Sequence, residues 1–145
     1  MTHLCENWQK AIDLLQSGGY TCVLCREDTV YTTTERGVKP LVRWLTEKAA
    51  VQGFYAADKV VGKATAYLYV LLGVKAVHAR IMSRSAARVL QENGIEAKWD
   101  TLVNNIINRQ GTGICPFEEA VLEIRTPEEA YPAIREKMVQ LNITL

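Results

Sequence analysis

Strands and helices alternate from residue 53 to residue 103, and this order constrains the fold more than any other feature of the chain. GFYAAD predicts a short buried strand that ends at Asp58, and the nearly all-apolar run GKATAYLYVLLGV predicts a helix buried on most sides. VKAVHARIM, SRSAARVLQENG and IEAKWDTLV predict a strand, a helix and a last strand. Because helices that join successive strands make those strands parallel, this part of the chain predicts a parallel sheet with helices on its faces.

The segments before residue 53 predict a helix, a hairpin and a second helix. The first helix ends at Gly18-Gly19, and its apolar residues recur at helical spacing at Leu4, Trp8, Ile12 and Leu15. YTCVLCRED and TVYTTTERG are rich in residues that favour strands, so they predict a hairpin that turns near Glu27-Asp28. VKPLVRWLTEKAA then predicts a helix over 38–50 with Pro40 in its first turn.

After residue 103 the sequence predicts a turn-rich connection over NNIINRQGTG, a short helix after Pro116 and a helix capped by Thr126. Together with the preceding elements, this order predicts an α/β fold. We expect a three-layer α/β/α arrangement around a mixed five-stranded sheet, in which a hairpin adds an antiparallel pair. Residues 1–145 would form a single domain with a C-terminal helical extension.

Composition limits the classes of function. A chain of 145 residues with 48% hydrophobic residues has the size and make-up of one soluble globular domain. The net charge of +1 argues against nucleic acid as an obligate partner. No apolar run is long enough to span a bilayer, and the N-terminal segment does not resemble a signal peptide. We therefore expect a cytoplasmic protein whose four cysteines are reduced thiols.

The element order is the one found in the cytidine-deaminase-like fold. In zinc deaminases a His/Cys-Ala-Glu motif opens the helix after the second strand, and a Pro-Cys-x-x-Cys motif opens the helix after the third. Here those helices open with RGVKPLVRW and DKVVGKATA, which contain neither His nor Cys, and the expected Glu is absent. The zinc ligands are missing at both positions, so we expect no metal and no other cofactor. A zinc deaminase would need new ligands in an unrelated geometry.

The runs GVKPL, ADKVVGKA and INRQGTGICPFE, together with the strand order, resemble a small bacterial family of unknown function. That family has the cytidine-deaminase-like fold and lacks the zinc motif. The resemblance covers almost the whole chain. It implies the fold and a pocket, and it implies no particular reaction.

The Gly-Lys pair in ADKVVGKATA raises the separate question of a nucleotide-binding phosphate loop. Such a loop has the form G-x-x-x-x-G-K-[ST], in which the spaced glycine lets backbone N–H groups surround the phosphates. Ala57 stands where the first glycine is needed, and Ala64 stands where Ser or Thr would bind magnesium. The sequence therefore argues against a phosphate loop.

The same pair is still expected at a helix N-terminus beyond the carboxyl end of a strand, where open α/β sheets bind ligands. Free N–H groups, the helix dipole and the charge of Lys63 would attract an anion at Gly62 and Lys63. Asp58 would orient Lys63, bind a ligand hydroxyl or act as an acid/base. In the structural alternative, Asp58 caps the buried helix and Lys63 is solvated.

The run INRQGTGICPFEEA is the second candidate segment. Cys115 precedes a proline at a helix start, where the dipole would favour the thiolate that nucleophilic catalysis requires. Arg109 would bind a carboxylate or phosphate beside Asn108, and Glu118 is a second candidate acid/base. In the structural alternative, Cys115 packs like a small apolar residue, and Asn108 and Arg109 tie down the loop.

The other cysteines and histidines carry weaker expectations. Cys22 and Cys25 form C-x-x-C, but residues three apart on a strand face opposite sides of the sheet, and no second pair completes a zinc site. His78 lies in the middle of a predicted strand, which favours a structural role. His3 is terminal.

Two functions remain open on these residues. The first is a small-molecule ligand-binding or regulatory protein whose pocket holds an anionic, possibly nucleotide-like molecule. Its ligand-binding residues would be Gly62, Lys63, Asn108 and Arg109. The alternative is a metal-independent enzyme with Cys115 as nucleophile and Asp58 or Glu118 as acid/base. Either function needs residues 58–63 to meet residues 108–118 in space. The apolar helix that carries Tyr67 and Tyr69 also leaves a homodimer contact open.

Overall fold

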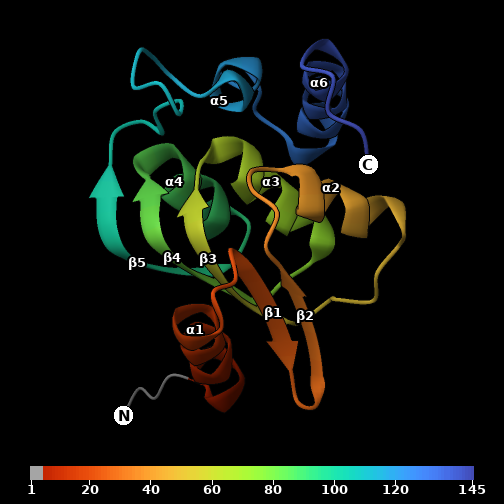
Figure 1. Cartoon of the computed structure of the whole chain (residues 1–145), viewed down its shortest axis with the longest axis vertical. Helices are drawn as coiled ribbons and strands as arrows, with labels where there is room; N and C mark the ends of the chain where they lie inside the picture. Colours follow the sequence, from red (N-terminus) through yellow and green to blue (C-terminus); the bar gives the residue numbers. More distant parts are fainter. Residues whose placement is uncertain (1–4) are drawn as a thin grey trace.

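The computed structural model describes residues 5–145, and its five strands form one mixed sheet in the order β2-β1-β3-β4-β5 (Figure 1). The hairpin strands β1 (Cys22–Arg26) and β2 (Thr29–Thr33) are antiparallel, and β1 is also antiparallel to β3 (Tyr55–Val61). β4 (Ala76–Ser83) and β5 (Glu96–Val103) continue the sheet parallel to β3. The mixed five-stranded sheet predicted from the sequence is confirmed.

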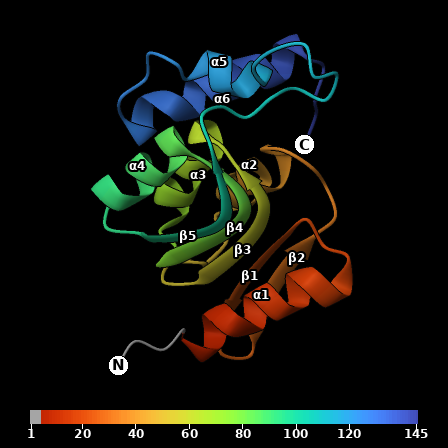
Figure 2. The same cartoon turned by 90° about the vertical axis from the view of Figure 1, so that its left-hand side faces the viewer.

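Helices cover both faces of this sheet (Figure 2). Helix α1 (Glu6–Gly18) packs against β1 and β3 on one face. Helices α2 (Lys39–Thr46), α3 (Lys63–Leu72) and α4 (Arg84–Glu92) lie on the other face. The last two helices, α5 (Pro116–Ala120) and α6 (Pro127–Gln140), pack against α3 on its side away from the sheet. This is the predicted α/β/α arrangement.

Two separate apolar clusters hold the layers together, one on each face. Cys22 and Leu24 belong to the larger cluster under α2, α3 and α4, whereas Val23 and Cys25 belong to the smaller cluster under α1. Strand β1 is therefore buried on both faces, and Cys22 and Cys25 lie on opposite faces as predicted. The indole of Trp8 anchors α1 further, because its N–H donates a hydrogen bond to the buried carbonyl of Ala56 at 3.1 Å.

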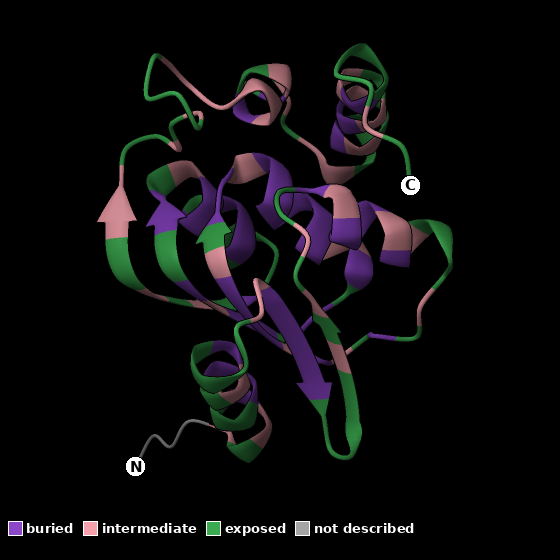
Figure 3. Ribbon diagram, in the orientation of Figure 1, coloured by how far each residue is buried: buried purple, intermediate pink, exposed green. Residues whose placement is uncertain are grey.

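Helix α3 forms the centre of the larger cluster. It is buried along nearly its whole length (Figure 3), as its all-apolar sequence predicts. It ends at Gly73, whose φ of 76° is the left-handed conformation that glycine adopts without strain. The cap predicted at Thr126 is also present, because Thr126 accepts a hydrogen bond from the Glu129 N–H. At the start of α4, Ser83 accepts one from the Ala86 N–H.

Two predicted bounds are wrong. β3 continues past Asp58, because Val60 and Val61 pair with Ile81 and Met82 of the neighbouring strand. Asp58 therefore lies inside a strand and not at its end. Helix α2 ends at Thr46 and not near residue 50, since Lys48 adopts a φ of 56° that an α-helix cannot contain.

Leu4 and His3, which the sequence analysis placed at the start of the chain, lie outside the described residues. Within residues 5–145, no helix combines the length and the apolar character that crossing a membrane requires.

Candidate functional site

A cavity of about 1060 Å³ opens beyond the carboxyl end of β3. Five segments line it: the start of β1, the loop into α2, the junction of β3 and α3, the loop after β5 with the start of α5, and the C-terminal tail at 141–144. Figure 1 shows the loop after β5 and the chain terminus on the same side of the sheet as the β3 arrowhead. A cavity of this volume holds a small organic molecule.

The structure brings together the two segments on which the predicted site depends. Six of the predicted residues line the cavity, namely Asp58, Gly62, Asn108, Arg109, Cys115 and Glu118. The seventh, Lys63, follows Gly62 at the start of α3, but it is not among the residues that line the cavity. The contacts these side chains make decide what each can do.

Glu118 caps helix α3 from a distant part of the chain. Its carboxylate accepts hydrogen bonds from the N–H groups of Lys63 at 2.8 Å and Ala64 at 3.0 Å. Only 9% of the residue is exposed. A Cβ at Gly62 would lie 2.5 Å from the Glu118 carboxyl carbon, so the glycine is needed to let the carboxylate approach the helix. The helix N-terminus thus holds an anion that the chain itself supplies.

Two expectations at this helix start are therefore wrong. The N–H groups of Lys63 and Ala64 are not free for a ligand, because Glu118 already accepts from both. Asp58 does not cap the helix, since it lies inside β3 and Glu118 takes that role. The Lys63 ammonium donates to the carbonyl of Leu122 at 3.2 Å, and this contact ties the segment after α5 to α3.

A buried hydrogen-bonded cluster of Cys22, Asp58 and Tyr69 lies at the floor of the cavity. Cys22 and Asp58 are direct partners on the antiparallel strands β1 and β3, and both line the cavity. The Tyr69 hydroxyl reaches them from α3: it donates to Asp58 Oδ2 at 2.6 Å and lies 3.1 Å from Cys22 Sγ. We call these three residues the floor cluster.

Burial dominates the protonation of the floor cluster. It raises the pKa of Asp58 to about 7, and hydrogen bonds from Tyr69 and from backbone N–H groups lower the pKa only in part. Burial also raises the pKa of Cys22 and of Tyr69 well above their usual values. At neutral pH the thiol and the phenol are therefore uncharged, and Asp58 is poised between its two forms.

Four basic residues line the cavity within the described part of the chain, and one of them, Lys39, is paired with Glu35. We call the other three the cationic rim: Arg36, Lys59 and Arg109. None of the three forms an ion pair with a residue between 5 and 145. The rim's nearby acid, Glu35, is already paired, because Arg43 and Lys39 both bind its carboxylate and lower its pKa. The rim charges are thus available to an anion from outside.

The other loop candidates have local contacts. The Asn108 side chain bonds to the backbone and side chain of Thr112, which fits the structural alternative of tying down the loop. Cys115 is half-buried and caps α5, a helix of only five residues. Among the described residues, none forms a hydrogen bond with the Cys115 thiol.

No metal centre emerges from the part of the chain that the structure describes. Over residues 5–145, no group of three or more His, Cys, Asp and Glu side chains is placed to bind a metal ion. His78 pairs with Asp100 through an Nε2–Oδ1 distance of 3.2 Å and does not line the cavity.

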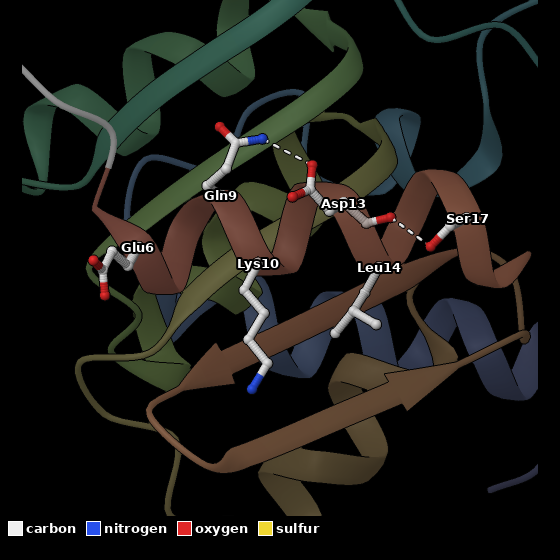
Figure 4. A pocket seen from close by; sticks show the side chains of 6 residues that line it. All are labelled: Glu6, Gln9, Lys10, Asp13, Leu14 and Ser17. Atoms are coloured by element: carbon white, nitrogen blue, oxygen red, sulfur yellow. Dashed lines mark hydrogen bonds between the residues drawn. The ribbon is translucent and has the colours of Figure 1, made fainter.

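A second, shallower hollow of about 400 Å³ runs along the outer surface of α1 (Figure 4). Three of its polar side chains are paired within the helix, since Asp13 accepts hydrogen bonds from Gln9 and, through its carbonyl, from Ser17. The Lys10 ammonium donates to the carbonyl of Glu27. Most of these groups have partners and all lie on one helix, so we place the candidate site in the larger cavity, which five segments line.

Sequence reasoning missed Cys22 and Tyr69 as members of the site. Their proximity to Asp58 depends on the pairing of β1 with β3 and on the way α3 packs over both strands. The available signal was a tyrosine in an otherwise apolar helix, because a buried hydroxyl needs a hydrogen-bond partner.

The comparisons with known proteins agree with this fold. A family model described as a domain of unknown function (DUF1893) matches residues 10–138. The chain belongs to the DUF1893 family. A crystal structure of a DUF1893 family protein from Thermotoga maritima is similar to it, with a TM-score of 0.84 and 25% sequence identity over 93% of this chain and 92% of that one. No protein with a curated description matches the sequence. The expectation that the chain belongs to a family of unknown function is confirmed, and the family description assigns no activity.

Proposed function

We propose that this DUF1893 protein binds a small anionic organic molecule in the cavity beyond β3, and that it serves as a ligand-binding or regulatory protein. The observation that carries the proposal is the cationic rim. Arg36, Lys59 and Arg109 converge from three different segments, and none of them is paired within residues 5–145. Convergent charges without internal partners are a common feature of sites for charged ligands.

The walls of the cavity favour a ligand with an apolar body. Alongside the charged residues, the lining includes apolar side chains from four of the five segments: Val38, Val60, Ile106, Ile107, Phe117, Leu141 and Ile143. Val60 and Ile107 are 41% and 53% exposed, so a ligand would cover apolar surface that now faces solvent. A ring that carries an anionic group suits both the walls and the rim.

The position of the cavity supports the cytidine-deaminase-like assignment, which is part of this proposal. The starts of α2 and α3 both line it, and these are the two helix starts that hold the metal in zinc deaminases of that fold. In this chain the Glu118 carboxylate lies on the α3 start. A nucleotide-like ligand would place its phosphate at the cationic rim and its ring against the apolar walls.

The alternative function is a metal-independent enzyme with Cys115 as nucleophile. Its supporting observation is that Cys115 lines the same cavity and is half-exposed, unlike the buried Cys22. The two candidate bases differ in availability. The Glu118 carboxylate already accepts hydrogen bonds from the N–H groups at the start of α3, whereas Asp58 keeps a free carboxylate lone pair. An enzyme would show fast, pH-dependent alkylation of Cys115, and a binding protein would not.

A cytoplasmic location completes the proposal. All four cysteines are free thiols, which suits a reducing compartment.

The test is a fluorescence titration with anilinonaphthalene sulfonate, an aromatic anion that fluoresces on entering an apolar site. The variant Arg36→Ala/Lys59→Ala/Arg109→Ala removes the rim. The control variant Arg80→Ala/Lys75→Ala/Arg88→Ala removes the same charge from exposed residues outside the cavity.

We expect the rim variant to weaken binding about tenfold or more, and the control variant to change it less than about twofold. Equal effects in the two variants would reject the proposed site.

A further inference from the structure

We propose that Asp58 binds an N–H donor of the ligand, so that the natural ligand carries a cationic or amide N–H group at one end and an anionic group at the other. This inference rests on the proposed function, because it concerns the same cavity. It adds the chemical class of the ligand and a residue that selects for it.

The first argument is the geometry of the Asp58 carboxyl group. The residue is 8% exposed and lines the cavity, so the ligand would meet it in a largely dry environment. Oδ2 accepts a short hydrogen bond of 2.6 Å from Tyr69. Oδ1 accepts only a long one of 3.4 Å, from the Val60 N–H. A carboxylate has room for about four donors, so Oδ1 keeps unfilled capacity.

The second argument is the direction of the hydrogen bonds in the floor cluster. The Tyr69 hydroxyl has one proton, and it donates that proton to Asp58. The contact of 3.1 Å between Tyr69 and Cys22 is therefore one in which the thiol donates to the phenol oxygen. The chain of donors runs from Cys22 through Tyr69 and ends on Asp58. The next group to bind Asp58 through its lone pairs must be another donor.

The third argument is electrostatic. No cation is paired with Asp58 among residues 5–145, and burial keeps its ionised form costly. A donor that enters the cavity would replace the lost solvation of the carboxylate, and a cationic donor would do so most strongly. The cationic rim meanwhile attracts the opposite charge at the mouth.

The Asp58 carboxyl group and the three cations of the rim together select a ligand with an N–H donor at one end and an anionic group at the other. The N–H end is an ammonium, an amidinium or an amide, and the anionic end is a carboxylate or a phosphate. A simple anion would pair with the cations of the rim but would give Asp58 no N–H donor.

The test compares two matched probes, para-aminomethylbenzoate and para-methylbenzoate, by isothermal titration calorimetry at about pH 8. The probes share the ring and the carboxylate, and only the first carries an ammonium donor. The variants are Asp58→Asn, which keeps an oxygen for the Tyr69 hydroxyl, and the control Asp100→Asn, which removes an exposed acid outside the cavity.

We expect the native protein and the Asp100→Asn variant to bind the aminomethyl probe at least tenfold more tightly than the methyl probe. In Asp58→Asn the two probes should bind equally, with the affinity for the methyl probe within about twofold of the native value. Equal binding of both probes by the native protein, or a preference that survives Asp58→Asn, would overturn this inference and leave the proposed anion site intact. Failure of both probes to bind would reject the proposed site as well.

A measurement on the native protein covers the case in which Asp58→Asn does not fold. From about pH 7.5 down to about pH 5.5, protonation of Asp58 should shrink the preference for the ammonium probe by roughly tenfold. Cys22 and Tyr69, which touch Asp58 from β1 and α3, stay uncharged over this range because burial raises the pKa of each. Glu35 stays ionised because Arg43 lowers its pKa, and Glu118 remains bonded to α3. A preference that does not change with pH would contradict a role for Asp58.

Discussion

At the residue scale, a single methyl group at position 62 would be enough to displace Glu118. The carboxylate sits so close to the start of α3 that a Cβ on Gly62 would lie 2.5 Å from its carbon and one of its oxygens. This contact explains why a Gly-Lys pair opens the helix although no phosphate loop is present. The glycine accommodates an anion, and that anion is Glu118.

The variant Gly62→Ala tests this contact. We expect it to lower the free energy of unfolding by about 2–4 kcal/mol, because the displaced carboxylate loses two charge-assisted hydrogen bonds. The measurement is urea denaturation, repeated in a Glu118→Ala background. There the same substitution should cost less than about 1 kcal/mol, since nothing remains to be displaced. Additive effects of the two substitutions would contradict the account.

The protonation of Asp58 makes a second prediction, about stability and pH. Burial raises its pKa to about 7 in the folded state, whereas an unfolded chain has a value of about 3.9. Between these values the folded protein keeps a proton that the unfolded chain has lost. Stability therefore falls as pH rises through this window, by up to about 4 kcal/mol.

The Asn side chain of the Asp58→Asn variant does not titrate, so this variant should not lose stability as the pH rises through the same window. Chemical denaturation of both proteins from about pH 4 to about pH 8 should show the stability of the native protein falling by a few kcal/mol relative to the variant. A difference that stays constant with pH would mean that Asp58 is not buried as described.

The sequence indicated which residues belong to the candidate site, but not which residues they form hydrogen bonds with. Asp58 and Glu118 were both recognised as candidates from local patterns. Their contacts, with Tyr69 for one and with α3 for the other, join residues 11 and 55 positions apart. No local propensity encodes such contacts, because they depend on how β3, α3 and α5 pack. Glu118, interpreted as an acid/base from the sequence, is found capping a helix for this reason.

At the element scale, the periodicity of β1 decides the environment of its cysteines. Cys22 and Cys25 face different apolar clusters, and both are buried. The C-x-x-C spacing therefore brings no pair of thiols together, which is what a strand dictates and a helix start would not.

Alkylation of the folded protein by iodoacetamide, followed by peptide mass spectrometry, tests this arrangement. Cys5 and Cys115 are half-buried and should react, whereas Cys22 and Cys25 should stay unmodified until the protein is unfolded. Burial raises the pKa of both protected thiols, so even moderately alkaline pH should not convert them to the reactive thiolate. Modification of Cys22 at the rate of Cys115 would show that the floor cluster is open to solvent.

Element order and type followed from periodicity, capping residues and glycine stops, as Thr126 and Gly18-Gly19 illustrate. Bounds were less predictable where a tertiary partner sets them. β3 continues past Asp58 because Val60 and Val61 pair with Ile81 and Met82 of β4. The residues of β3 alone do not predict this pairing.

At the scale of the whole molecule, the cavity exists only because five segments converge beyond the sheet. Two of these contain residues 58–63 and 108–118, which the sequence had marked as candidate site segments. Arg36 and the tail at 141–144 were not marked, since neither belongs to a pattern that indicates a binding or catalytic role. The family description adds no activity, so the function proposed here depends on the convergence itself.

The central claim is that this cavity binds small anionic molecules. The most direct measurement is a titration of the isotope-labelled protein with anilinonaphthalene sulfonate, followed by amide proton–nitrogen correlation spectra. The account predicts that the shifting signals cluster at the segments that line the cavity, 21–22, 35–39, 58–65, 106–118 and 141–144. Shifts confined to α1 along the hollow of Figure 4, or no shifts at all, would contradict it.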